Sequence, residues 1–189
     1  IFPTPVIGGV GLVSDISKTL NHHFKGEDNV ILLVGKTFGH IEQSCFLKEN
    51  HSITDGMPPE INLLNEKNNG ECLLKLIEKE LILSSHDISS GGLIVALAEM
   101  ALPSNFGVKI HKPKKLTNLS SYLFGEDQAR YIIEIEPKNL TKIEKILKED
   151  NIYYENIGFT QKECFEIEGE LKINNKDLFK INNEWYNNF

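Results

Sequence analysis

The apolar residues of this chain fall into two patterns. A continuous apolar run that ends at glycine, residues 29–35, predicts a buried strand. Further short strands are expected at residues 81–85, 107–110, 130–136 and 153–160. Residues 163–174 alternate apolar and polar side chains around Gly169, which is typical of a hairpin. The chain is therefore expected to contain a sheet of several short strands.

The second pattern places apolar residues three or four positions apart, the spacing of one helical face. It predicts helices at residues 70–80, at 90–101 and after Pro137, and a closing helix is expected at 177–186. Thr141 and Glu144 have the spacing of a capping box for the helix after Pro137. Residues 50–70 are rich in Asn, Pro, Glu and Gly and are expected to form a long surface loop.

The order of these elements indicates the fold class. Strands and helices alternate without a strict strand–helix rhythm, so we expect an α+β fold with a mixed β-sheet layered with helices. Residues 131–160 have the pattern of one strand–helix–strand half of a ferredoxin-like unit. Residues 3–13 are expected to be extended, because Pro3 and Pro5 exclude a helix there.

Composition narrows the class of protein. The net charge is −7 and Arg130 is the single arginine. No lysine cluster alternates with aromatic residues, so nucleic-acid binding is not expected. No apolar run approaches the ~18 residues of a membrane span. The sequence begins without methionine inside a strand-like pattern, which favours a segment cut from a longer protein.

The cysteines and histidines give no sign of a metal site. Cys45, Cys72 and Cys164 are odd in number and far apart, which argues against a disulfide framework or zinc and favours a reducing cytoplasm. Cys45 has no nearby base in sequence and is interpreted as a packed thiol. All histidines except His86 are interpreted as surface residues without metal-ligand spacing: His22, His23, His40, His51 and His111.

The segment SHDISSGGL at residues 85–93 is the first that could carry chemistry. A strand ends there and two glycines open a helix, whose free backbone N–H groups favour a phosphate or carboxylate. His86 can donate a hydrogen bond or move a proton, and Asp87 could hold a hydrated magnesium ion. The alternative is structural: Asp87, Ser89 or Ser90 caps the helix, and the glycines allow close packing.

The segment LFGEDQAR at residues 123–130 is the second. Glu126 or Gln128 could bind a substrate amide or ribose, and Arg130 could pair with a phosphate. The alternative is an internal ion pair of Arg130 with Glu126 or Asp127. The glycine-rich turn in VGKTFGHIEQSCF, residues 34–46, matches no nucleotide-binding motif, and Lys36 and Thr37 are interpreted as turn residues.

Taken together, these segments resemble the formylglycinamidine ribonucleotide synthase family. PTPVIGGVGLV, NVILLVG, SHDISSGGLIVALAEMA and LFGEDQARYIIEI occur in the order and approximate spacing of its last domain, which is similar to aminoimidazole ribonucleotide synthetase. The resemblance covers nearly the whole chain. It implies that residues 1–27 are the tail of a preceding ATP-binding domain with a connector. Residues 28–189 would be the C-terminal domain, with the fold of the corresponding synthetase domain.

The resemblance implies an ATP-dependent ligation in purine biosynthesis. The amide oxygen of formylglycinamide ribonucleotide is phosphorylated, and ammonia made from glutamine displaces the phosphate to give an amidine. The implied cofactors are ATP and magnesium, bound mainly by preceding domains. The implied partners are those domains, a glutaminase subunit and a small structural subunit, in the cytoplasm.

The resemblance also suggests a limited role for this chain. The catalytic histidine and most ATP and magnesium ligands would lie upstream, so no catalytic or metal-binding residue is expected here. The candidate nucleotide-binding residues are His86, Asp87, Ser89, Gly91 and Gly92. The candidate substrate-binding residues, which correspond to a Glu-Ser-Gln loop, are Glu126, Asp127 and Gln128.

Several residues depart from the family pattern. Asp127 replaces the middle serine of that loop, and a carboxylate there would repel a substrate phosphate. Ser90 stands where the family often has Asp, and residues 41–46 replace a Gly-Gly-Ser-Glu-like turn. These departures favour a partly structural copy. The alternatives are another enzyme of the same superfamily, such as aminoimidazole ribonucleotide or selenophosphate synthetase, or a non-catalytic docking module.

The apolar N-terminal segment gives a first prediction. If residues 1–13 are a strand separated from its original sheet, they should fray or pair with a second molecule, because an unpaired strand invites partners. Light scattering measures the oligomeric state, and the chain is expected to be a non-native oligomer or a monomer whose N-terminus is frayed. A monomer with an ordered, unpaired N-terminal strand would contradict this.

Overall fold

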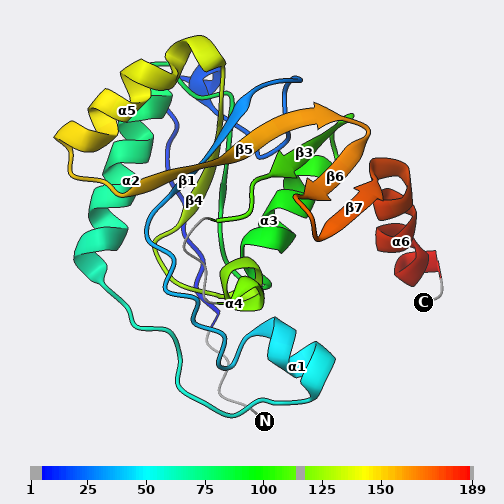
Figure 1. Ribbon diagram of the computed structural model, residues 1–189. Coiled ribbons are helices and arrows are strands. Elements are labelled where there is room, and N and C mark those ends of the chain that lie inside the picture. The colour runs from blue at the N-terminus through cyan, green and yellow to red at the C-terminus, as the bar shows by residue number, and fades with distance from the viewer. Residues whose placement is uncertain (1–5, 114–117, 188–189) are drawn as a thin grey trace.

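The computed structural model describes residues 6–113 and 118–187, and these contain a seven-stranded sheet in the order β2-β4-β1-β5-β3-β6-β7 (Figure 1). The strands are β1 (Val30–Val34), β2 (Ser84–Asp87), β3 (Phe106–Ile110), β4 (Tyr131–Ile135), β5 (Tyr154–Lys162), β6 (Cys164–Ile167) and β7 (Leu171–Asn174). The α-helices are α1 (Cys45–His51), α2 (Leu63–Glu78), α3 (Gly92–Ala101), α4 (Leu119–Phe124), α5 (Leu140–Glu149) and α6 (Asn175–Asn187). Short 3₁₀ helices lie at Ile16–Lys18 and Pro137–Asn139.

The sheet separates two apolar cores. Successive side chains of a strand point to opposite faces, so Ile31 and Leu33 of β1 join one core and Leu32 and Val34 join the other. The first core contains residues of α3 and α4, and the second contains residues of α2 and α5. Figure 1 shows α2 and α5 side by side, with α3 on the other side of β1 and β4. Burial on both faces explains the continuous apolar run of β1.

The α+β prediction is confirmed. The sheet is mixed, since β3 pairs with β6 in parallel while the other strand pairs are antiparallel. β4 and β5 flank β1 as its two antiparallel neighbours and are joined through α5, which is the expected split strand–helix–strand unit. β6 and β7 form the predicted hairpin around Gly169, whose φ of 73° suits glycine.

Some boundaries differ from the predictions. The strand expected at 81–85 begins at Ser84, while Leu81 and Ile82 are buried in the second core just before it. α2 begins at Leu63, inside the stretch expected to be a loop, because Asn62 accepts a bond from the Asn65 N–H and caps it. The helices α1 and α4 were not predicted.

The predicted capping box at Thr141 is wrong. α5 begins at Leu140, directly after the 3₁₀ turn Pro137–Asn139, and Asn139 at the N-cap makes no side-chain capping bond. The extended N-terminal segment is only partly testable, since residues 1–5 lie outside the described residues. Residues 6–13 are exposed and form no strand. In the described part of the chain, no helix is both long and apolar enough to cross a membrane.

A buried carboxylate fastens the segment before β1 to the sheet. Glu134 of β4 is fully buried and accepts bonds from the backbone N–H groups of Lys25 and Gly26. It also accepts from the Asn29 amide at 2.7 Å and the Ser84 hydroxyl at 2.7 Å. Glu134 therefore satisfies donors from the connector and from β2 that have no strand partner at those positions.

Replacing Glu134 should destabilise the chain strongly. In Glu134→Ala, four buried or half-buried donors lose their acceptor, and the free energy of unfolding should fall by about 3 kcal/mol. Urea unfolding followed by circular dichroism measures this. The matched control is Glu149→Ala on the exposed face of α5, expected to change stability by less than about 0.5 kcal/mol. Equal effects in the two variants would contradict the role given to Glu134.

Candidate functional site

The helix α3 begins at two glycines in left-handed conformations. Gly91 has φ 85° and Gly92 has φ 73°. A Cβ atom on Gly91 would lie 2.4 Å from Val95 Cγ2, and one on Gly92 would lie 2.7 Å from the Gly125 carbonyl oxygen. The glycines therefore permit both the turn and the contact with the 125–128 loop. The expectation that Asp87, Ser89 or Ser90 caps α3 is wrong. Gly91 is the N-cap residue, and it makes no side-chain capping bond.

A carboxylate from the second segment occupies this helix start. Glu126 Oε1 accepts a hydrogen bond from the Gly91 N–H at 2.8 Å and another from the Cys45 N–H of α1 at 2.8 Å. Negative charge is stabilised beside such free N–H groups. The position where the sequence suggested a bound phosphate or carboxylate thus holds a carboxylate of the chain itself.

His86 lies at the other end of the same turn, in β2. Its Nδ1 is 3.3 Å from Asp87 Oδ1, and its Nε2 is 3.2 Å from Glu99 Oε2 on α3. The centroids of the His22 and His86 rings are 5.0 Å apart. Burial, together with the neighbouring His86, lowers the pKa of His22. Two carboxylates thus position His86, and its mostly buried ring keeps one edge at a surface hollow.

That hollow has a volume of about 420 Å³ and contains two of the predicted nucleotide-binding residues, His86 and Asp87. Its other lining residues come from the connector, α2 and the sheet: Leu20, Asn21, His22, Leu73, Ile77, Ser85 and Tyr131. Ser89 is exposed, whereas Gly91 and Gly92 are buried, and none of the three lines this hollow. Of the predicted nucleotide-binding residues, His86 and Asp87 therefore line a hollow, whereas Gly91 and Gly92 are covered by the protein.

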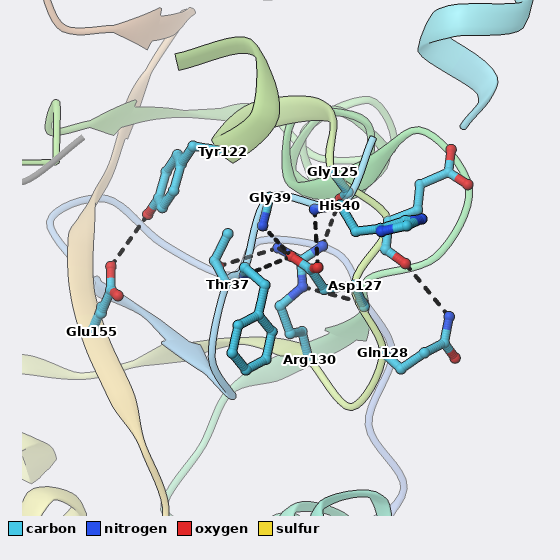
Figure 2. Close-up of polar contacts among 11 residues, drawn as sticks. Thr37, Gly39, His40, Tyr122, Gly125, Asp127, Gln128, Arg130 and Glu155 are labelled. Carbon is cyan, nitrogen blue, oxygen red and sulfur yellow. Dashed lines mark hydrogen bonds and ion pairs between the residues drawn. The ribbon is translucent and has the colours of Figure 1, made fainter. Parts of the chain in front are cut away.

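Asp127 is bound by a loop from a distant part of the chain. Its carboxylate is 4% exposed and accepts bonds from the N–H groups of Phe38, Gly39 and His40 at 2.9, 2.9 and 3.1 Å (Figure 2). Consecutive N–H groups that converge in this way form an anion-binding concavity. Asp127 thus fixes the turn after β1 against the loop before β4.

Arg130 is internal, with a side chain that is 0% exposed. Its guanidinium donates to the carbonyl oxygens of Gly125 at 2.6 Å and Asp127 at 3.2 Å, and to the Thr37 hydroxyl at 3.2 Å. The Asp127 carboxylate lies 3.9 Å away. Burial lowers the pKa of Arg130, and Asp127 partly offsets this. Of the two interpretations, the internal ion pair is therefore the one observed.

Gln128 is the exposed member of the predicted substrate-binding set. It lines a second hollow of about 290 Å³ together with Asp127. The other lining residues belong to the 38–40 turn, the start of α2 and the same loop: Phe38, His40, Glu60, Asn62, Asn65 and Ala129. The two predicted sets therefore face different hollows, and Glu126 connects them through its bond to Gly91.

The 37–40 turn was not predicted from the sequence to be the partner of this loop. Its N–H groups and the Thr37 hydroxyl bind Asp127 and Arg130, although Thr37 was interpreted only as a turn residue. The signal available was the glycine-rich turn directly after a buried strand. Cys45 was interpreted as a packed thiol, but it is exposed and Cys72 is buried, so that interpretation is wrong. Burial and the nearby Asp150 raise the pKa of Cys72 to about 11.

In the described part of the chain, side chains that could bind a metal ion do not cluster. Among residues 6–113 and 118–187, no group of three or more His, Cys, Asp and Glu side chains has the arrangement of a metal site. The Asp87 and Glu99 carboxylates each contact His86.

A known domain family matches most of this chain. Residues 26–167 match the family described as AIR synthase related protein, C-terminal domain. The chain belongs to this family. The matched range includes the 37–40 turn, the start of α3 and the 125–130 loop, and it ends before β7 and α6.

Relatives of this family member are much longer proteins. Over all 189 residues the chain is 44% identical to the phosphoribosylformylglycinamidine synthase subunit PurL of Pelagibacter ubique, of which it covers 26%. It is 37% identical over 185 residues to the PurL subunit of Rhodopseudomonas palustris, of which it covers 25%. The chain thus spans about a quarter of the length of these relatives.

Solved structures show the same fold. T. maritima PurL complexed with FGAR matches 87% of this chain with a TM-score of 0.70 and 17% sequence identity, over 30% of its own length. T. maritima PurL complexed with ATP matches 87% of this chain with a TM-score of 0.66 and 15% identity, over 28% of its own length.

The Asp127 carboxylate should be important for stability. In Asp127→Asn the side chain keeps its shape, but its amide group must face backbone N–H donors and Arg130 loses its buried counter-charge. The free energy of unfolding is expected to fall by about 2–4 kcal/mol in urea unfolding. The neighbouring control Gln128→Ala should change it by less than about 0.5 kcal/mol. An Asp127→Asn variant as stable as the control would refute the structural role.

Proposed function

We propose that this chain is the C-terminal part of a phosphoribosylformylglycinamidine synthase. The observation that carries the proposal is the 44% identity over every residue of the chain to a protein of that name. Sequence identity at this level over the whole chain, with the family match at residues 26–167, favours a shared role within a shared longer polypeptide.

The proposed reaction joins ammonia to an amide carbon. ATP phosphorylates the amide oxygen of formylglycinamide ribonucleotide and leaves as ADP. Ammonia then attacks that carbon and phosphate departs, which gives formylglycinamidine ribonucleotide. ATP and magnesium would be bound mainly by parts of the polypeptide outside this chain. Glutamine would supply the ammonia through a glutaminase subunit.

The described side chains suggest what this domain contributes. His86 and Asp87 line an open hollow and are the accessible members of the proposed nucleotide-binding set, whereas Ser89, Gly91 and Gly92 shape the turn beside it. Asp87 is exposed and its carboxylate lies beside the His86 ring, at 3.3 Å from Nδ1.

The proposed substrate-binding set divides in the same way. The carboxylates of Glu126 and Asp127 already accept backbone hydrogen bonds, so they would have to release those bonds before binding a ligand. We infer that they hold the loop that presents Gln128, whose exposed carboxamide can bind a substrate amide or ribose hydroxyl.

The proposal includes partners and a compartment. The other domains of the polypeptide, a glutaminase subunit and a small structural subunit would complete the enzyme. A solved structure of PurLQS from Thermotoga maritima, similar in fold, supports assembly with further subunits. The proposed cytoplasmic location suits the three free cysteines Cys45, Cys72 and Cys164.

The geometry favours a non-catalytic role for the chain by itself. Glu126, Asp127 and Arg130 are the charged groups of the most distinctive loop, and all three bind the chain's own backbone. A reacting group must have an unoccupied position beside the substrate. The isolated chain is therefore proposed to frame a site rather than to perform the chemistry.

An assay of ADP release tests the proposal. With ATP, ammonia and formylglycinamide ribonucleotide, the full polypeptide is expected to turn over and residues 1–189 alone are not. In the full polypeptide, Gln128→Ala should raise the KM for the ribonucleotide about fivefold, the loss of roughly one hydrogen bond. Asn68→Ala, an exposed amide on α2, should leave the KM unchanged. No turnover by the full polypeptide with ammonia would reject the ligase function.

A further inference from the structure

One end of the molecule exposes large apolar side chains that the fold does not use. The exposed fractions are 79% for Phe38, 71% for Met57, 65% for Ile61, 76% for Leu63 and 65% for Leu64. We call these five residues the 57–64 surface. Single exposed apolar residues are common, whereas a group of them in one region marks an interaction site. In Figure 1 this segment is the cyan loop that runs from α1 along the end of the molecule into α2.

Hydrogen bonds hold this loop against the 38–43 turn. The carbonyl oxygen of Met57 lies 2.9 Å from His40 Nε2, and its N–H donates to Glu42 Oε2 at 2.7 Å. Phe38 lines the same 290 Å³ hollow as Glu60 and Asn62. The exposed apolar residues therefore belong to one held surface and not to separate mobile loops.

The helix α2 begins earlier than its own packing requires. Its buried residues are Asn69, Cys72 and Leu76, so the turn that starts at Leu63 contacts no core. Asn62 nevertheless caps this turn and fixes Leu63 and Leu64 in an exposed position. A capped turn that exposes two leucines is unfavourable in water, and it becomes favourable when another surface covers it.

We propose that the 57–64 surface docks against the remainder of the same polypeptide, an inference that rests on the proposed function. The relatives are several times longer, and this chain matches 26% of one of them, so a large covalently linked surface is available. Residues 52–64 contain two acidic residues, Asp55 and Glu60, and no lysine or arginine. The core of a permanent interface is depleted in charge and apolar in this way.

Pro58 and Pro59 also favour docking of this surface against the remainder of the polypeptide. Prolines restrict the loop in the free chain, so little conformational entropy is lost when it is covered. Covalent linkage adds a high local concentration of the covering surface, so docking needs no strong intrinsic affinity. A second copy or a separate subunit would lack that advantage.

Cysteine labelling in the longer polypeptide tests this docking. Leu63→Cys and Met57→Cys are introduced separately, with Cys45→Ser to remove the exposed thiol, and a maleimide is the probe. The matched control is Lys145→Cys on α5, whose side chain is 76% exposed. Peptide mass spectrometry assigns each label to its position.

In residues 1–189 alone, all three positions should react at similar rates, which gives the reference rate for an uncovered surface. In the longer polypeptide, Leu63→Cys and Met57→Cys should react at least about tenfold more slowly than Lys145→Cys, since reaction then requires opening of the interface. Equal rates would overturn the proposal. Protection that disappears on dilution would assign the surface to a second copy, and protection that needs another subunit would assign it to that subunit. Both results overturn it.

The ligase assay separates this inference from the proposed function. An active polypeptide that labels rapidly at Leu63→Cys would reject the docking and leave the function intact. A protected polypeptide without ligase activity would support the docking and reject the function.

Discussion

Backbone N–H groups without a helix or strand partner must find an acceptor, and in this domain three carboxylates supply it. Asp127 accepts from three consecutive N–H groups of the 38–40 turn, Glu126 from the starts of α1 and α3, and Glu134 from the connector before β1. Each carboxylate lies on or near β4 and each donor lies far away in sequence. The connector before β1, the 38–40 turn and the starts of α1 and α3 are therefore held by charge-assisted hydrogen bonds.

This use of carboxylates explains why the most distinctive loop carries little free chemistry. A carboxylate that satisfies buried donors cannot leave them without a desolvation cost. Arg130 is held in the same way by the Gly125 and Asp127 carbonyl oxygens and the Thr37 hydroxyl. Gln128, His86 and Asp87 remain as polar groups that face open hollows, and they are the groups from which a ligand contact would be made.

The strands and long helices were predictable because burial imposes a period on the sequence. β1 and β4 are covered on both faces; β1 reads as a continuous apolar run and β4 as an apolar run interrupted by Glu134. α5 shows its buried face as Ile143 and Leu147. α1 and α4 have seven and six residues, too few for a helical period to be evident. The contacts of Asp127 with Phe38 and of Glu126 with Cys45 join residues more than 80 positions apart, and no local pattern predicts such pairs. The cap of α3 was mispredicted for the same reason, because its acceptor comes from another loop.

The shared acceptor at Glu126 has a mechanical consequence. One oxygen atom, Oε1, receives the N–H of Cys45 and the N–H of Gly91, each at 2.8 Å. Any displacement of α1 relative to α3 must stretch at least one of these two bonds. The two helix starts are therefore coupled, and a load applied to α1 is passed to the turn between His86 and α3 through this shared oxygen as well as through the stacking of Phe46 on Phe124.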